Sequence, residues 1–243
     1  MILLSPVQTI LYRMPCKWSL NIDLWYYISE SGDEMKEANI NKYDHKIVRI
    51  TDTGGKIFTG EAGFVSAEYA FHEYGKEKDA LELNGYTIFE DTIEKIEVLK
   101  GMEVIRAQEL WQQAGAYYVR IQGMAKKHHI TLKQEFDEHD TPDTKYIVIN
   151  EDDFPIATAR MYPLDHDSVM IGRVVVLPEY RRLGIGTMVV TECEAWAEDL
   201  GYSRFVVESR DNKVEFYEQL GYEVCGRISP GDTFRCIRME KRL

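Results

Sequence analysis

The fold of this protein is decided by residues 173–200, which read RVVVLPEYRRLGIGTMVVTECEAWAEDL. The run of three valines favours a buried strand, and Pro178 ends that strand because proline cannot donate to a strand ladder. After Gly186, apolar residues recur at helical spacing until Gly201 supplies a stop signal. These apolar positions are Val189, Cys193, Trp196, Ala197 and Leu200. The stretch therefore predicts a strand, a glycine loop and a helix.

The loop between this strand and this helix reads RRLGIG, residues 181–186. Its backbone N–H groups run directly into a helix N-terminus, an arrangement that binds phosphate. A dinucleotide-binding turn would need glycines immediately after the strand, and a third glycine where this chain has Val189. The sequence therefore predicts a phosphate-binding loop that is not of the Rossmann type.

This loop resembles the R/Q-x-x-G-x-G/A acyl-CoA pyrophosphate loop of the GNAT superfamily of N-acetyltransferases, with Arg181, Gly184 and Gly186 at the patterned positions. The preceding VVVLPEYR and the later FYEQLGY, residues 216–222, strengthen the resemblance, which covers residues 102–243. It implies an α/β fold with a GNAT-like mixed sheet flanked by helices. It also implies acetyl-CoA as the cofactor and transfer of an acetyl group to an amine of a small molecule or protein.

The resemblance also implies a set of cofactor-binding residues. They are Val174, Val175, Val176, Arg181, Arg182, Leu183, Gly184, Ile185, Gly186, Thr187, Asn212 and Tyr217. The family often carries an asparagine six residues before the phenylalanine of the FYEQLGY motif, where this chain has Arg210. Asn212 lies two positions later.

Acetylation of an amine needs proton transfers, because a primary amine with a pKa near about 10.4 is protonated at neutral pH. Members of the family often use a glutamate on the central strand as the base, but residues 170–176 contain no carboxylate. Glu135 and Asp137 are the catalytic candidates, because the E-x-D-x-x-D pattern that they form with Asp140 resembles an acceptor-side segment of one acetyltransferase subgroup. Tyr217 resembles the tyrosine that often protonates the departing thiolate. Packing of a short helix is the alternative role for Tyr217.

Residues 35–101 form a second predicted domain, a small all-β barrel-like domain that precedes the acetyltransferase-like one. Short strand-like runs at 46–51, 57–65, 80–83, 86–89 and 93–99 are separated by turn signals. The lengths and spacing of these runs resemble those of Sm-like or SH3-like small barrels. Sm-like barrels bind RNA, so RNA binding is an alternative function. Acidic residues outnumber basic ones here, whereas an RNA groove needs cations. Five aromatic residues could stack on bases, but they are expected instead in the barrel core and in hairpin packing: Phe58, Phe64, Tyr69, Phe71 and Tyr74.

Residues 1–34 show no sustained helical or strand period and stay unassigned, and Met35 resembles an ordinary protein start. A net charge of −12 disfavours attraction to nucleic acid and to anionic membrane. The four cysteines include no C-x-x-C pair, and His128, His129 and His139 lack metal-ligand spacing, so no metal site is expected. We expect a cytoplasmic protein without a membrane span, in which the barrel contacts protein or forms a homo-oligomer. A non-catalytic acyl-CoA-binding regulator is a further alternative.

Overall fold

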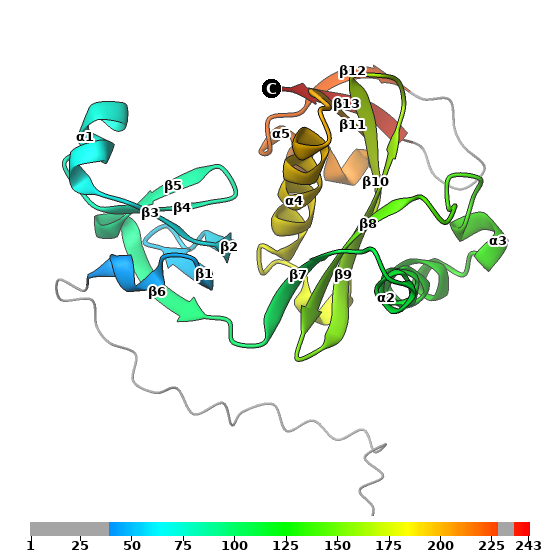
Figure 1. The fold of residues 1–243 in the computed structure, drawn as a ribbon, viewed down its shortest axis with the longest axis horizontal. Coiled ribbons are helices and arrows are strands. Elements are labelled where there is room, and N and C mark those ends of the chain that lie inside the picture. Colours follow the sequence, from blue (N-terminus) through cyan, green and yellow to red (C-terminus); the bar gives the residue numbers. More distant parts are fainter. Residues whose placement is uncertain (1–38, 228–235) are drawn as a thin grey trace, which may run out of the picture. The chain divides into compact units, whose positions relative to one another are not determined.

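The structure, a computed structural model, describes residues 39–227 and 236–243, and its largest sheet is a mixed sheet of seven strands (Figure 1). The strand order is β12-β13-β11-β10-β9-β8-β7, and all neighbours are antiparallel except β10 and β11. The strands are β7 (Met102–Arg106), β8 (Lys145–Glu151), β9 (Phe154–Pro163), β10 (Ser168–Val176), β11 (Arg204–Arg210), β12 (Glu223–Arg227) and β13 (Cys236–Arg242). This confirms the predicted mixed α/β sheet.

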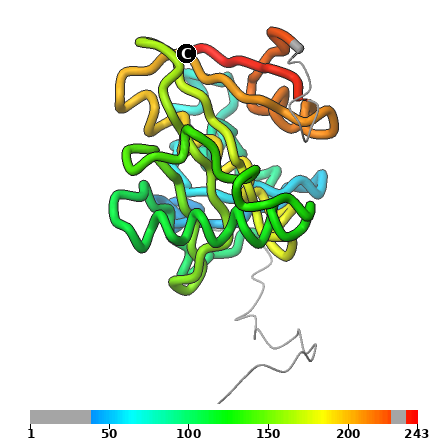
Figure 2. Tube along the Cα trace, turned by 90° about the vertical axis from the view of Figure 1, so that its right-hand side faces the viewer, coloured from blue at the N-terminus to red at the C-terminus, as the bar shows by residue number. Residues whose placement is uncertain are grey.

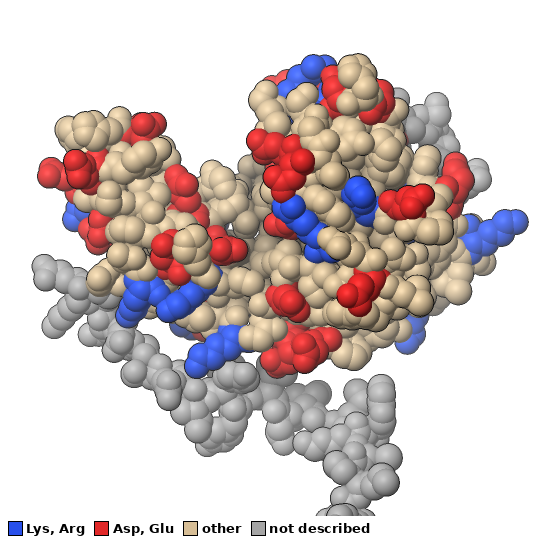
Figure 3. Space-filling model, viewed as in Figure 1, with Lys and Arg blue, Asp and Glu red and all other residues tan. Residues whose placement is uncertain are grey.

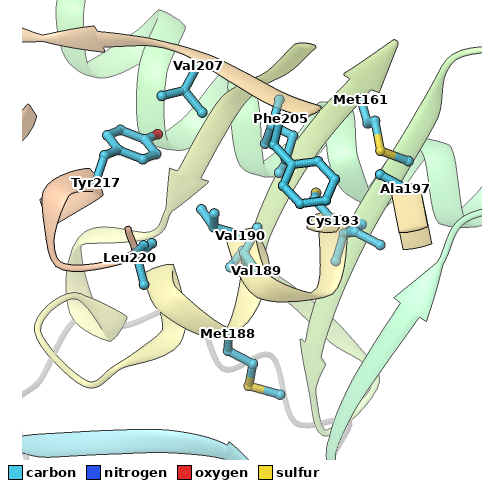
Figure 4. Close-up of a cluster of buried hydrophobic side chains, with 14 of the residues drawn as sticks. Met161, Met188, Val189, Val190, Cys193, Ala197, Phe205, Val207, Tyr217 and Leu220 are labelled. Atoms are coloured by element: carbon cyan, nitrogen blue, oxygen red, sulfur yellow. The ribbon is translucent and has the colours of Figure 1, made fainter. Parts of the chain in front are cut away.

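Helices cover both faces of this sheet, as the tube view shows for α2 and η3 (Figure 2). On one face, α4 (Ile185–Asp199) packs against the largest core cluster, which includes Val189 and Cys193 (Figure 4). On the other face, α2 (Leu110–Arg120) packs Ala116 against β8 and Val119 against β10. The shorter helices are α3 (Leu132–Glu135), η4 (Pro178–Tyr180), η5 (Asp211–Lys213) and α5 (Val214–Glu218). The predicted strand, loop and helix of residues 173–200 are confirmed.

The helix that begins at Leu110 does not end at Gly123, although a glycine often stops a helix. The chain continues through it as a π-helical segment, η3 (Ile121–Lys126). Gly123 is buried there, and a Cβ atom added to it would lie 2.5 Å from Val175 Cγ1. The residue is a glycine because η3 approaches β10 closely, and this reason is not visible in the local sequence.

The predicted barrel before this sheet is wrong, because its strands form two separate three-stranded sheets that do not close. One has the order β2-β1-β6 and the other β3-β4-β5. The strands are β1 (Ile47–Asp52), β2 (Ile57–Glu61), β3 (Gly63–Val65), β4 (Ala80–Leu83), β5 (Tyr86–Phe89) and β6 (Ile93–Val98), and the 3₁₀ turns are η1 (Ile40–Tyr43) and η2 (Glu90–Thr92). We call residues 47–98 the N-terminal strand module. The predicted strand positions are confirmed, except that the run 57–65 divides into β2 and β3, which belong to different sheets; the predicted closure into a barrel is not found.

A helix that the strand rhythm did not predict, α1 (Ala67–Tyr74), interrupts this module between β3 and β4. Ser66 caps its N-terminus, and Gly75, with φ 69°, ends it. The helix exposes Tyr69, Phe71 and Tyr74, so their predicted place in a barrel core is wrong. Phe58 and Phe64 do pack against the module's core. Among the described residues, no helix is long and apolar enough to cross a membrane.

Candidate active site

The two parallel strands at the centre of the large sheet separate partway along their length. β10 and β11 pair only from Ser168 and Arg204 to Ile171 and Val207. β10 continues to Val176, and its ladder with β9 continues with it. The edge of β10 that faces β11 therefore leaves the ladder over its last residues. The backbone groups on this edge are not paired with β11, and a ligand that pairs with a strand backbone could bind to them.

A β-bulge lies where the strands begin to separate. The register between β10 and β9 shifts between Gly172 and Val175, and Arg173 adopts φ 50°. A bulge redirects side chains. Val174 and Val176 pack toward the core on the α4 side, Val175 packs on the α2 side, and Arg173 reaches the carboxylates of residues 135 and 137.

The glycine loop lies directly after this strand and leads into α4. Gly184 is the N-cap of α4 and has φ 77°, a conformation that glycine adopts readily. Arg181 Nε donates to the carbonyl oxygen of Val176 at 2.9 Å, so the patterned arginine ties the loop to the end of β10. An added Cβ at Gly186 would lie 3.5 Å from Phe216 of α5, which is ordinary contact. The loop thus has the form of an anion site at the start of a 15-residue helix.

Arg181 of this loop is one of several basic residues whose charges act on His128. The pKa of His128 is lowered by desolvation and then by the positive charges of Arg210, Lys127 and Arg181. Acidic and basic side chains are interspersed over the face seen in Figure 3.

A buried ion-pair network lies on the α2 side of the sheet. Arg120 is fully buried and donates to Glu135 Oε1 at 2.8 Å and to Asp140 Oδ1 at 2.5 Å. Tyr146 donates its hydroxyl proton to the same Asp140 oxygen at 2.6 Å. Arg160 donates to Asp140 Oδ2 at 2.7 Å. Each carboxylate oxygen of Asp140 therefore has an arginine partner.

The same network holds Arg173 in place at the bulge. Arg173 Nη2 donates to Asp137 Oδ2 at 2.9 Å, and Arg173 Nε donates to the carbonyl oxygen of Glu135 at 3.1 Å. Arg160 donates to both oxygens of Asp137, at 2.6 and 3.0 Å. Burial would raise the pKa of Asp137, but the Arg160 hydrogen bonds, together with the charge of Arg173, lower it. Both predicted bases therefore have cationic partners.

Tyr217 lies in α5, on the α4 side of the sheet, and points toward Val207 of β11 (Figure 4). Its ring packs against Phe216 and Tyr222, with centroids 5.0 and 5.6 Å apart. Burial raises the pKa of its hydroxyl, so the phenol keeps its proton at neutral pH. Asn212 is exposed in η5.

The predicted site residues thus fall into two groups. The valines and residues 181–187 are continuous along β10, the loop and α4, with Tyr217 in the same core. Glu135 and Asp137 belong instead to the network on the α2 side. The sequence reasoning missed Arg120, Arg160 and Arg173. A signal was available, because an arginine within an otherwise apolar helix face or strand needs a carboxylate partner, and residues 135–140 contain four carboxylates.

Comparisons with known proteins agree with this geometry. Residues 107–222 match the model of the acetyltransferase (GNAT) family. A presumed acetyltransferase of Bacillus subtilis is 29% identical over 129 residues, which are 52% of this chain and 87% of that protein. The uncharacterized N-acetyltransferase YjcF of the same organism is 28% identical over 123 residues, 51% of this chain and 86% of that protein.

The solved structure of a presumed N-acetyltransferase from Lactobacillus plantarum superposes with a TM-score of 0.57. It is 29% identical and covers 59% of this chain and 99% of its own. The separated strands and the glycine loop both lie within residues 107–222, the part of the chain that matches the acetyltransferase (GNAT) family.

Proposed function

We propose that this protein is an N-acetyltransferase that transfers the acetyl group of acetyl-CoA to an amine of a small molecule or protein. The observation that carries the proposal is the open edge of β10, which leads directly into the glycine loop at the N-terminus of α4. Acetyl-CoA is the cofactor that a GNAT acetyltransferase domain uses. Its extended pantetheine arm and its anionic pyrophosphate suit an open strand edge and a helix N-terminus, respectively.

Different residues of the site would bind different parts of acetyl-CoA. The backbone of Val174, Val175 and Val176 would pair with the pantetheine amides, because this edge of β10 has left the ladder. The N–H groups of residues 182–187 would bind the pyrophosphate. Arg181 would fix the loop through its bond to Val176. Arg182 and Asn212 are exposed beside the loop and in η5, and we assign them to the outer part of the cofactor.

We assign the proton donor for the CoA thiolate to Tyr217. Its raised pKa keeps the phenol protonated, as a general acid must be before the reaction. Contacts with the rings of Phe216 and Tyr222 position the Tyr217 side chain through its ring and not through its hydroxyl group. In the packing alternative, the hydroxyl would contribute nothing to turnover.

The ion pairs favour a positioning role for Glu135 and Asp137 over proton removal from the amine. A general base works best with a pKa near the working pH, whereas arginine partners lower the pKa of Asp137. Glu135 is 1% exposed and pairs with Arg120. The contacts of these carboxylates indicate that they hold Arg173 and Arg160 in place at the bulge.

Glu208 is a better-placed base. It lies on β11 immediately after the last β10–β11 pair, so it borders the opening between the strands. Phe205 and Val207 face the α4 core, and strand alternation therefore directs Glu208 to the opposite face. Burial raises the pKa of Tyr162 of β9, and the negative charge of Glu208 adds to this shift. An exposed carboxylate there could accept a proton from an incoming amine directly or through water.

Isothermal titration calorimetry with acetyl-CoA tests the cofactor assignment. Gly186→Glu would put a carboxylate beside the pyrophosphate, and we expect it to abolish measurable binding. Gly226→Glu on edge strand β12 is a matched control, because an added Cβ there meets nothing within 4 Å. Equal affinity in the parent and the Gly186 variant would refute the loop assignment. Amine-dependent release of free CoA from acetyl-CoA would then separate the enzyme from a non-catalytic acyl-CoA binder.

A further inference from the structure

The glycine loop makes a side-chain contact with the N-terminal strand module. Thr59 of β2 is 1% exposed, and its hydroxyl donates to the carbonyl oxygen of Leu183. Leu183 immediately precedes Gly184, so this bond holds the loop one residue before α4 begins. The two residues are 124 positions apart in sequence. The contact is therefore a product of the tertiary fold.

Gly184 lies close to the backbone of Thr59 as well as to its side chain. A Cβ atom added to Gly184 would lie 2.7 Å from the backbone nitrogen of Thr59 and 3.0 Å from its Oγ1. Side chains essentially never approach backbone this closely. Gly184 thus needs to be glycine for two reasons, its positive φ and its contact with β2.

Asn84 reinforces the same contact from the hairpin between β4 and β5. Its Nδ2 donates to the carbonyl oxygen of Thr59 at 2.7 Å, and Thr191 of α4 donates its hydroxyl proton to Asn84 Oδ1 at 3.1 Å. Asn84 itself has φ 51°, as expected in an Asn-Gly hairpin turn. Gly60 leaves room for the amide, because a Cβ there would lie 2.8 Å from it. One side chain therefore joins β2, the hairpin and the first turns of α4.

A second contact reaches the helix that carries the proposed general acid. Tyr86 of β5 donates its hydroxyl proton to the carbonyl oxygen of Gln219 at 2.9 Å. Gln219 is the C-cap of α5, two residues after Tyr217. The module thus contacts both the cofactor loop and the end of the Tyr217 helix.

From these contacts we infer that the N-terminal strand module completes the cofactor site, with Thr59 and Asn84 acting as positioning residues for the pyrophosphate loop. The inference rests on the proposed binding of acetyl-CoA at residues 181–187. A loop whose N–H groups are already held in place loses less conformational freedom when it binds an anion. Removing the Thr59 hydroxyl would leave the Leu183 carbonyl without this donor and release the loop.

The test uses the full chain with three single variants. Thr59→Val removes the hydroxyl while keeping the branched shape, Thr59→Ser restores a hydroxyl, and Thr51→Val makes the same change in β1, outside the contact. We expect Thr59→Val to raise the dissociation constant for acetyl-CoA about tenfold, the effect of losing one hydrogen bond. Thr59→Ser should recover most of the affinity, and Thr51→Val should bind as the parent does.

Hydrogen exchange separates positioning from general destabilisation. With no ligand present, we expect the amides of residues 182–187 to exchange about tenfold faster in Thr59→Val, while amides of β8 and β9 exchange as in the parent. Faster exchange throughout the chain, or affinity equal to that of the parent, would overturn the inference. Failure of the parent itself to bind acetyl-CoA would instead refute the proposed function.

Discussion

Arg120, fully buried at the end of α2, contacts both carboxylate oxygens of Asp140, at 2.5 and 3.1 Å. The pair joins α2 to the loop before β8, and Asp140 also contacts Arg160 of β9. Because Arg160 and Asp137 continue the network to Arg173, the same contacts support the bulge at the separated strands. The stability of the fold and the geometry of the site are therefore linked here.

Asp140→Asn should destabilise the protein strongly. Removing one partner of a buried ion pair leaves an uncompensated charge and typically costs about 3–5 kcal/mol. Urea unfolding at pH 7 measures this loss. Glu97→Gln is the control, because its partner Lys95 and Glu97 itself are exposed and such a pair contributes less than about 1 kcal/mol. Similar losses in the free energy of unfolding of the two variants would mean that the buried ion pairs of Asp140 stabilise the fold no more than an exposed pair does.

Stability should fall in acid for the same reason. Burial would raise the pKa of Asp140, but hydrogen bonds from Arg120, Tyr146 and the Asp137 backbone outweigh it and hold the pKa well below its usual range. A carboxyl group whose pKa is lower in the folded state stabilises the fold above its unfolded pKa, near about 4, and loses this contribution as the pH falls further.

The measurement is urea unfolding of the parent and of Asp140→Asn at pH 7 and at pH 3. We expect the parent to lose more stability than the variant over this interval, because the variant has no such carboxylate to protonate. Asp143→Asn, at an exposed aspartate in the same loop, should follow the parent. Equal losses of stability between pH 7 and pH 3 in the parent and in Asp140→Asn would contradict the role of Asp140 in the acid dependence.

The two glycines of the cofactor loop should respond differently to alanine. At Gly184 an added methyl group would meet the backbone of Thr59 at 2.7 Å in a residue with φ 77°, so Gly184→Ala should weaken acetyl-CoA binding at least tenfold. At Gly186 the methyl group would meet Phe216 at an ordinary 3.5 Å. Gly186→Ala should therefore bind within about threefold of the parent. Calorimetry checks both values, and equal losses at the two positions would argue against the contact with β2.

Tyr217→Phe should reduce turnover without changing cofactor affinity. The ring keeps its packing against Phe216 and Tyr222, and only the proton donor is removed. A general acid contributes about a hundred- to ten-thousand-fold, so kcat should fall within that range while the acetyl-CoA dissociation constant stays constant. Thermal unfolding of the variant provides the control. Unchanged turnover in a folded variant would leave packing as the only role of Tyr217.

Glu208→Gln should remove the acidic limb of the pH–rate profile if Glu208 accepts the proton of the amine. Turnover should fall about a hundredfold or more at neutral pH, while acetyl-CoA still binds. Asp137→Asn is the comparison, because its carboxylate pairs with Arg160 and Arg173 and should affect stability more than the profile. A lost acidic limb in Asp137→Asn alone would restore Asp137 as the base.

The sequence by itself determined the strand, loop and helix of residues 173–200. Each of these elements depends on local signals: a β-branched run, a proline, two glycines and a helical period. The same local rules found β4 and β5, whose bounds agree with the predicted 80–83 and 86–89. They also identified the loop that can hold an anion, because a glycine-bearing helix N-terminus is a short-range feature.

Only the tertiary structure decided which distant groups meet at that loop and at the bulge. Gly123 stays inside a helical segment because it packs against Val175, and Gly184 contacts Thr59, although neither partner is near in sequence. The N-terminal strands keep their predicted positions but form two open sheets, because closure depends on pairing between strands and not on the propensity of each. Arg120 and Asp140 likewise look like ordinary polar residues until burial removes water and makes each the other's required partner.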